Sequence, residues 1–92
     1  MILKRNMVYQ VLMGGKQRKD LKKLNPNIQN KINETFVLLS INLFVGKTMH
    51  GQLKKKRSIR LWPYRIIYEI HEKEKKIKIF AIGHRQGVYK KL

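Results

Sequence analysis

Two arginines in the last third of the chain stand in apolar, strand-like segments. Arg65 lies within Pro63–Ile70, and Arg85 ends the segment Ile82–Arg85, shortly before Tyr89. An arginine on a strand is held by a rigid element and points to one face of the sheet. Its planar guanidinium binds phosphate oxygens bidentately and stays charged. The two arginines therefore predict a site that holds a phosphate.

An RNA backbone is cut without a metal when three tasks are met. The 2′-OH must be deprotonated, the charge on the phosphate stabilised, and the leaving 5′-oxygen protonated. Arg65 and Arg85 suit the second task, because fixed donors aimed at developing charge contribute about 3 kcal/mol each. The acid and the base would come from Tyr89, His84 or a lysine that loses its proton readily among like charges. We predict an RNA-cleaving site with Arg65, Arg85, Tyr89 and His84 as its catalytic residues.

Each of these residues also has a structural interpretation. Arg65 can form a salt bridge at a strand edge, although only five acidic residues are available in the chain. His84 can be a surface residue at a strand end, and Tyr89 can anchor the C-terminal segment by packing. The basic segment before Arg65 can be a solvated face, or it can steer RNA through its field. We predict RNA binding there, by Lys54, Lys56, Arg57 and Arg60.

The charge balance limits the partners. Lys and Arg number 22 against five acidic residues, which gives a net charge of +17 in 92 residues. Such a chain repels itself unless a polyanion neutralises it, and the usual polyanions are nucleic acid, an anionic membrane surface or an acidic protein. The longest apolar run, residues 36–45, is interrupted by Ser40 and Asn42 and is too short to span a bilayer. We expect no membrane partner, and nucleic acid is the leading partner.

We expect neither a targeting signal nor a metal motif in this sequence. The N-terminus has no long apolar segment typical of a signal peptide, so we expect a cytoplasmic protein. Cysteine is absent, which excludes disulfides and thiolate metal sites, and the three histidines are widely spaced. We expect no metal and no cofactor.

The apolar periodicity predicts a single α+β domain over residues 1–92. The predicted order is β-α-α-β-β-β, with strands over 7–13, 54–62, 64–71 and 76–82 and helices over 16–24 and from 25 to about 44. The last three strands are joined by short turns and must form an antiparallel meander. We expect the N-terminal strand and the helical hairpin to pack on this meander, with both helices on one face.

The second helix has the clearest pattern. Asn25 and Pro26 suit the cap and the first helical position. A buried face follows at helical spacing, formed by Ile28, Ile32, Phe36, Leu39 and Leu43. Val37, Leu38 and Ile41 widen this apolar surface, so we expect the helix to be covered on more than one side. Residues 45–47 should end the helix, and residues 48–52 should form a loop.

Several segments of the chain carry a family resemblance. They are "VYQV" at 8–11, "KDLKKL" at 19–24, "GKTMHGQLKKK" at 46–56, "PYRIIYEI" at 63–70 and "IGHRQGVYK" at 82–90. With the element order, they resemble the RelE/ParE superfamily of type II toxins, in its RelE-type branch. The resemblance covers nearly the whole chain and implies the RelE-like microbial RNase fold.

RelE-type toxins are small basic ribonucleases that enter the ribosomal A site and cut mRNA there without a metal. The resemblance implies that Arg65 and Arg85 bind and stabilise the scissile phosphate. It implies that Tyr89 acts as the base or orients the 2′-OH. Lys54 and Lys56 correspond to groups that hold the RNA or tune the proton transfer.

The resemblance also implies partners. They are mRNA, the ribosome and a cognate acidic, RelB-like antitoxin, which a neighbouring small acidic open reading frame would encode. The free toxin is expected to be monomeric and to form a hetero-oligomer with the antitoxin. Two other functions stay open. One is a ParE-like DNA gyrase inhibitor on the same fold, and the other is a non-catalytic basic RNA-binding protein, which the charge alone supports equally well.

Overall fold

The protein is described from a computed structural model, over residues 8–51 and 55–91. The elements are β1 (Gln10–Met13), α1 (Gly15–Lys22), α2 (Pro26–Ile41), β2 (Lys47–Thr48), β3 (Lys56–Leu61), β4 (Tyr64–His71), β5 (Lys76–His84) and a 3-10 helix, η3 (Val88–Lys91). The described strands form one sheet in the order β1-β5-β4-β3-β2. Strand β1 runs parallel to β5, and the other neighbouring pairs are antiparallel. The predicted α+β fold and its meander are confirmed.

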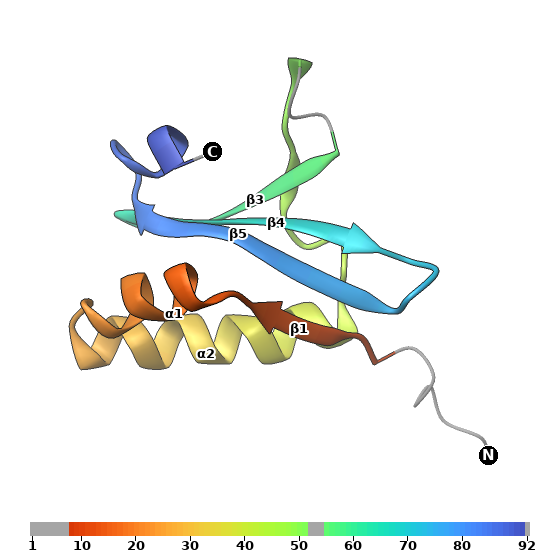
Figure 1. Ribbon diagram of the computed structural model, residues 1–92, viewed down its shortest axis with the longest axis horizontal. Helices are drawn as coiled ribbons and strands as arrows, with labels where there is room; N and C mark the ends of the chain where they lie inside the picture. Colours follow the sequence, from red (N-terminus) through yellow and green to blue (C-terminus); the bar gives the residue numbers. More distant parts are fainter. Residues whose placement is uncertain (1–7, 52–54, 92) are drawn as a thin grey trace.

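The sheet separates two layers. Helices α1 and α2 cover one face, and η3 lies on the other (Figure 1). On the helix face, α2 packs its buried Ile32 and Leu39 against apolar side chains of β4 and β5. A smaller cluster of Ile67, Ala81 and Val88 lies on the opposite face. This opposite face, called the open face below, is covered by neither α1 nor α2 (Figure 1), and η3 packs against part of it.

The central pair of strands carries a bulge. Ile67 of β4 faces Ala81 of β5, whereas the next residue, Tyr68, faces Ile79. Phe80 is thus an extra residue in β5, and such a bulge bends and twists the strand locally. The rest of the ladder keeps the alternation of strand side chains, so Ile66 faces the helices and Ile67 faces away.

Helix α2 begins as predicted and ends earlier. The Asn25 side chain accepts a hydrogen bond from the Asn27 N–H at 2.8 Å, and Pro26 takes the first helical position. The helix ends at Ile41, because Asn42 leaves the helical region with φ −137° and ψ 84°. The predicted end at residues 45–47 is wrong.

The end of α2 is set by a tertiary contact. The buried Tyr68 hydroxyl of β4 donates to the Leu43 carbonyl at 2.8 Å and accepts from the Gly46 N–H at 3.0 Å. These two bonds draw the segment after the helix to the sheet, where Lys47 and Thr48 pair with Ser58 and Arg57 as β2. The sequence analysis assigned Thr48 to a loop. It missed β2 because its two residues are exposed and show no apolar alternation.

The outer side of α2 is uncovered within the part of the chain that the structure describes. Val37 and Ile41 are 66% and 65% exposed, and Leu38 is 42% exposed. The prediction that the helix is covered on more than one side is therefore wrong for this chain alone. The buried face of the helix is as predicted, since Ile32 and Leu39 are fully buried.

The other strands follow the predictions closely. Strand β4 has the predicted bounds, and β5 runs two residues further, to His84. The predicted strands over 7–13 and 54–62 are shortened to β1 and β3, while Met7 and Lys54 lie outside the described residues. Among the described helices, none is long and apolar enough to cross a membrane.

We expect Tyr68→Phe to lower the free energy of unfolding by about 1–3 kcal/mol, because it leaves the Gly46 N–H and the Leu43 carbonyl without their buried partner. Urea denaturation would measure the change. Tyr64→Phe is a matched control, since the Tyr64 hydroxyl makes no hydrogen bond to a described residue. Equal losses in the two variants would show that Tyr68 does not hold this segment.

Candidate functional site

The first candidate arginine lies on the open face near the start of β4. Arg65 is half-buried and stands directly opposite Arg60 of β3 on one side and Gly83 of β5 on the other. Its Nη1 donates to the Ser58 Oγ at 3.2 Å. Like charges directly opposite on neighbouring strands destabilise a sheet. The Arg60–Arg65 pair is therefore a local conflict of the kind found at functional sites.

A cavity of about 340 Å³ lies beside this pair. It is lined by Val45, Lys47, Ser58, Ile59, Arg60 and Arg65. Three of these residues are cationic and none is acidic, so the cavity suits an anion. Lys47 and Ser58 were missed by the sequence analysis. No sequence signal identified them, because their position beside Arg65 depends on the pairing of β2 with β3.

The second candidate arginine follows β5 at the same end of the sheet. The Arg85 N–H donates to the Pro63 carbonyl at 2.8 Å, so the backbones of the two segments are fastened together there. The predicted neighbourhood of the Arg65 and Arg85 strands is confirmed. Their guanidinium groups meet different partners: Arg65 bonds Ser58, whereas the exposed Arg85 lies 4.4 Å from the centroid of the Trp62 ring.

His84 and Tyr89 flank these arginines. His84 pairs with Tyr64 in the ladder, and their rings meet edge to face at 6.0 Å. The His84 Nδ1 accepts the Gln86 N–H at 3.2 Å. Tyr89 lies in η3 and is 45% exposed, while Val88 beside it is fully buried under the open face. Val88, rather than Tyr89, anchors the segment.

The basic segment divides between the two faces of β3. Lys54 lies outside the described residues. Lys56 and Arg60 project on the open face, where Lys56 lies 3.8 Å from Glu69 and its ammonium stands 4.2 Å from the centroid of the Phe80 ring. Arg57 turns to the other face. Its Nε and Nη2 donate to the Gly46 carbonyl at 3.1 and 2.7 Å, and Nη2 also donates to the Phe44 carbonyl at 3.3 Å.

RNA binding by these four residues stays a prediction, but the contacts rank them. Arg60 is exposed and close to Arg65, so it is available to a ligand. Arg57 is committed to backbone carbonyls and holds the segment that precedes β2. The alternation of β3 carried this signal, because Arg57 shares its face with the core residues Ile59 and Leu61.

The acidic residues are concentrated away from this end of the sheet. Three of the five acids, Glu69, Glu72 and Glu74, lie at the end of β4 and in the turn to β5. Arg85 and Pro63 lie at the other end of the same hairpin. Lys73, Lys75 and Lys76 offset the charge of these acids, whereas the other end carries Arg60, Arg65 and Arg85, so a polyanion is attracted to the end with the arginines. Within the described residues, no group of three or more His, Asp or Glu side chains could hold a metal ion.

Comparison with known proteins places the chain in a family. A family profile described as "ParE toxin of type II toxin-antitoxin system, parDE" matches residues 15–89. A chain of the toxin–antitoxin complex RelBE2 from Mycobacterium tuberculosis is 32% identical, with a TM-score of 0.77 over 86% of this chain and 93% of that chain. A search of curated proteins finds no significant match.

Two further structures are similar. A chain of the archaeal RelE–RelB complex from Pyrococcus horikoshii is 26% identical, with a TM-score of 0.71 over 86% of this chain and 97% of that chain. A mutant of the Escherichia coli toxin RelE in the free state is 16% identical, with a TM-score of 0.77 over 92% of this chain and 94% of that chain. At that identity, the last likeness concerns the fold alone.

We expect Arg57→Lys to destabilise the protein by about 1.5–3 kcal/mol, because one ammonium cannot replace several charge-assisted hydrogen bonds from a planar fork. Arg60→Lys is the matched control on the same strand, since Arg60 is exposed and no hydrogen bond of its guanidinium to a described residue is known. Chemical denaturation of both variants measures the difference. Equal stabilities would show that Arg57 is not a structural arginine.

Proposed function

We propose that this chain, which belongs to the ParE toxin family of type II toxin–antitoxin systems, is a metal-independent endoribonuclease that cleaves mRNA on the ribosome. It would stop translation in the cytoplasm, as a RelE-type mRNA interferase. The observation that carries the proposal is the Arg60–Arg65 cross-strand pair beside a cavity without an acidic lining residue. The Arg65 guanidinium bonds Ser58 and that of Arg60 lies near Trp62, but both residues line this cavity, so both can donate to a phosphate held in it.

Arg65 is the residue best prepared to stabilise the reacting phosphate. It projects from a central strand, and its bond to Ser58 limits the motion of its guanidinium. Donors that are fixed before the reaction need no reorganisation when charge develops on the phosphate oxygens. Arg85 and Arg60 would bind the same or the adjacent phosphate from either side of β4.

Cleavage requires a nucleophile from the substrate itself. The 2′-oxygen attacks phosphorus, the bond from phosphorus to the 5′-oxygen breaks, and the products are a 2′,3′-cyclic phosphate and a free 5′-OH. One group takes the proton of the 2′-OH, and another gives a proton to the 5′-oxygen. We assign the proton donor to His84, which would donate from its imidazolium form, and Tyr89 suits the orientation of the 2′-OH.

The exposure of these groups supports a need for the ribosome. His84, Arg85 and Tyr89 are all exposed on the toxin alone, so water competes with the substrate at each of them. A partner that fixes the mRNA against this end of the sheet would supply orientation that the toxin lacks. Ribosome-bound mRNA in the A site is therefore the proposed substrate.

A gyrase inhibitor is the second candidate, because the matching family profile is that of ParE toxins. The two functions differ in their use of Arg65. A nuclease needs this arginine at the scissile phosphate, whereas an inhibitor that binds a protein has no need for a half-buried guanidinium beside an anion cavity. A supercoiling assay and a translation assay with the same preparation separate them. A purely RNA-binding protein would bind message in a salt-dependent manner and leave it intact.

We expect Arg65→Ala or Arg85→Ala to relieve growth arrest and to lower mRNA cleavage by roughly 100-fold to 1,000-fold for each donor lost. Cleavage of ribosome-bound mRNA, followed by primer extension, measures the effect. Lys73→Ala is the matched control, because it removes the same charge from the turn at the other end of the hairpin. Full toxicity of both arginine variants would reject the nuclease.

The partner that neutralises this protein is proposed to be an acidic, RelB-like antitoxin. Besides the charge of +17, the chain exposes an apolar strip at the end of α2 and just beyond it. The strip consists of Val37, Leu38, Ile41, Phe44 and Val45. A cavity of about 370 Å³ adjoins it, with Ile41 and Phe44 among its lining residues. A second copy is a poor occupant, because two such basic chains repel each other, so the free toxin should be monomeric.

We expect Ile41→Lys to weaken binding of the antitoxin by roughly 10-fold to 100-fold, since Ile41 then cannot be buried as an apolar side chain. The added positive charge acts in the opposite direction towards an acidic partner, so weaker binding identifies apolar contact rather than charge attraction. Asn33→Lys adds the same charge to α2 at an exposed position outside the strip and should not weaken binding. Calorimetry with the product of the neighbouring acidic open reading frame measures both. Unchanged or tighter binding of the Ile41 variant would remove the strip from the interface.

A further inference from the structure

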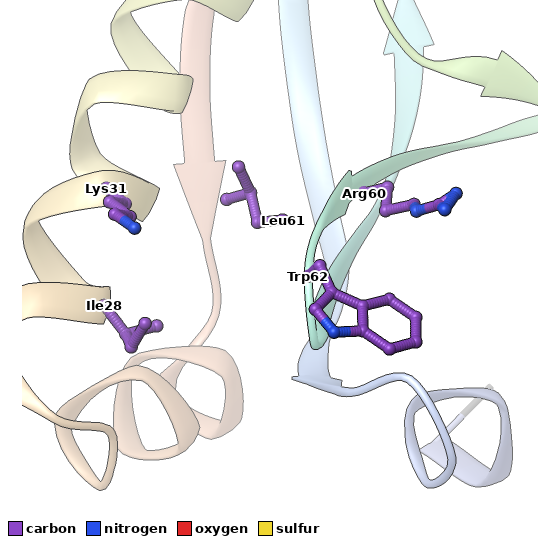
Figure 2. Close-up of a pocket in the computed structure, with 5 residues that line it drawn as sticks. All are labelled: Ile28, Lys31, Arg60, Leu61 and Trp62. Atoms are coloured by element: carbon purple, nitrogen blue, oxygen red, sulfur yellow. The ribbon is translucent and has the colours of Figure 1, made fainter.

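The turn between β3 and β4 presents the only tryptophan of the chain to solvent. Trp62 is 62% exposed, although tryptophan is highly buried on average. Figure 2 shows Leu61 pointing towards α2, whereas the Trp62 indole and the Arg60 side chain project from the other side of β3. Leu61, the last residue of β3, thus packs against the core, and the larger ring stays outside. An exposed indole is expensive to hydrate, so its use lies in contact with something else.

Two arginines surround this ring. The Arg85 guanidinium lies 4.4 Å from the ring centroid, and that of Arg60 lies 5.6 Å from it. The sheet fixes the backbones that carry both arginines, because Arg60 is in β3 and the Arg85 N–H is bonded to the Pro63 carbonyl. The indole is therefore held at a defined place with cations beside it, while most of its surface stays accessible.

The ring adjoins the proposed phosphate site through Arg60. This arginine and Trp62 line a cavity of about 290 Å³ whose other lining residues are Leu61 and, from α2, Ile28 and Lys31, and Arg60 also lines the anion cavity together with Arg65. Arg85, the other neighbour of the ring, belongs to the same site. A nucleotide presents a flat base and, one sugar away, a negatively charged phosphate. The arrangement of an aromatic ring between phosphate-binding cations matches both parts.

We propose that Trp62 is a stacking platform for a base of single-stranded RNA, next to the phosphates held by Arg60, Arg65 and Arg85. This inference rests on the proposed function, because it names a further contact to the same substrate. Single-stranded nucleic acid is commonly bound by a basic groove with aromatic side chains on which bases stack. Every base has a flat face, so Trp62 adds affinity and register without reading sequence.

A purely structural interpretation is that the arginines cover the ring and stabilise the turn. The two interpretations differ in one observable. Because Trp62 is the sole tryptophan, the intrinsic fluorescence of the protein reports this ring alone. A base stacked on the indole quenches its fluorescence, whereas a turn-stabilising role gives no reason for quenching by bases.

The test is a fluorescence titration of the full chain with a 2′-O-methyl oligonucleotide, which binds but cannot be cleaved. We expect strong quenching at saturation. An abasic oligonucleotide of the same length has the same phosphates, so it should still bind, as the fluorescence anisotropy of a dye on the oligonucleotide would show. It should leave the intrinsic fluorescence of Trp62 nearly unchanged. Equal quenching by the two ligands, or none by the first at saturation, would overturn the proposal.

Substitutions give the second arm. Trp62→Ala should weaken binding of the oligonucleotide by roughly 5-fold to 100-fold, and Trp62→Phe should retain most of the affinity. The slope of log affinity against log salt should be unchanged in Trp62→Ala, because no phosphate contact is lost, and should fall by about one in Arg85→Ala. Wild-type affinity of a folded Trp62→Ala variant, checked by circular dichroism, would also reject the platform.

The failure of this inference is distinct from failure of the nuclease. Quenching without cleavage of ribosome-bound mRNA would leave the platform in place and reject the activity. Cleavage with unaltered kinetics in Trp62→Ala would keep the nuclease and reject the platform.

Discussion

The antiparallel ladder between β4 and β5 is the constraint on which the rest of this structure depends. It places Arg65 opposite Gly83 and brings Arg85 back to the Pro63 carbonyl. The same ladder carries the bulge at Phe80, which lets both faces of the sheet pack: one against the helices, the other against η3. A shift of one residue in this register would turn Arg65 towards the helices and abolish the basic end of the hairpin.

Charge is the second constraint, and it acts against stability. A net charge of +17 on 92 residues disfavours the compact chain, and Arg60 facing Arg65 adds a local cost. The fold offsets part of this by giving some cations internal partners. Lys56 meets Glu69 and Phe80, and Arg57 meets backbone carbonyls. Arg60 and Arg65 lie side by side in the ladder at one end of the sheet, so part of the cost lies where an anionic ligand can remove it.

Sequence alone could predict the elements with strong local signals. Strand β4 was bounded correctly because an aromatic and β-branched run lies between a proline and a polar turn. The start of α2 followed from its cap. The end of α2 and the strand β2 could not be predicted, because both depend on the Tyr68 hydroxyl, which reaches a segment more than twenty residues away in the chain. The exposed strip on α2 was misread for a related reason: apolar periodicity marks a surface that something covers, and it does not say whether the cover is in the same chain.

Some residues of the candidate site could likewise be identified from the sequence, and others only from the structure. Residue type and strand position were enough to single out Arg65 and Arg85, yet Arg57 and Arg60 look alike in the sequence and differ in role. Alternation separates them, since Arg57 shares its face with core residues and Arg60 does not. Trp62 could not be identified as an RNA contact from the sequence, because a tryptophan is expected to be buried. The structure shows that Leu61 packs against the core and that Trp62 is left exposed (Figure 2). The role of an arginine or a tryptophan on this small sheet is inferred from whether its side chain already has partners within the chain. Side chains whose partners lie within the chain stabilise the fold, and those held in place but left exposed are the ones that a phosphate or a base can engage.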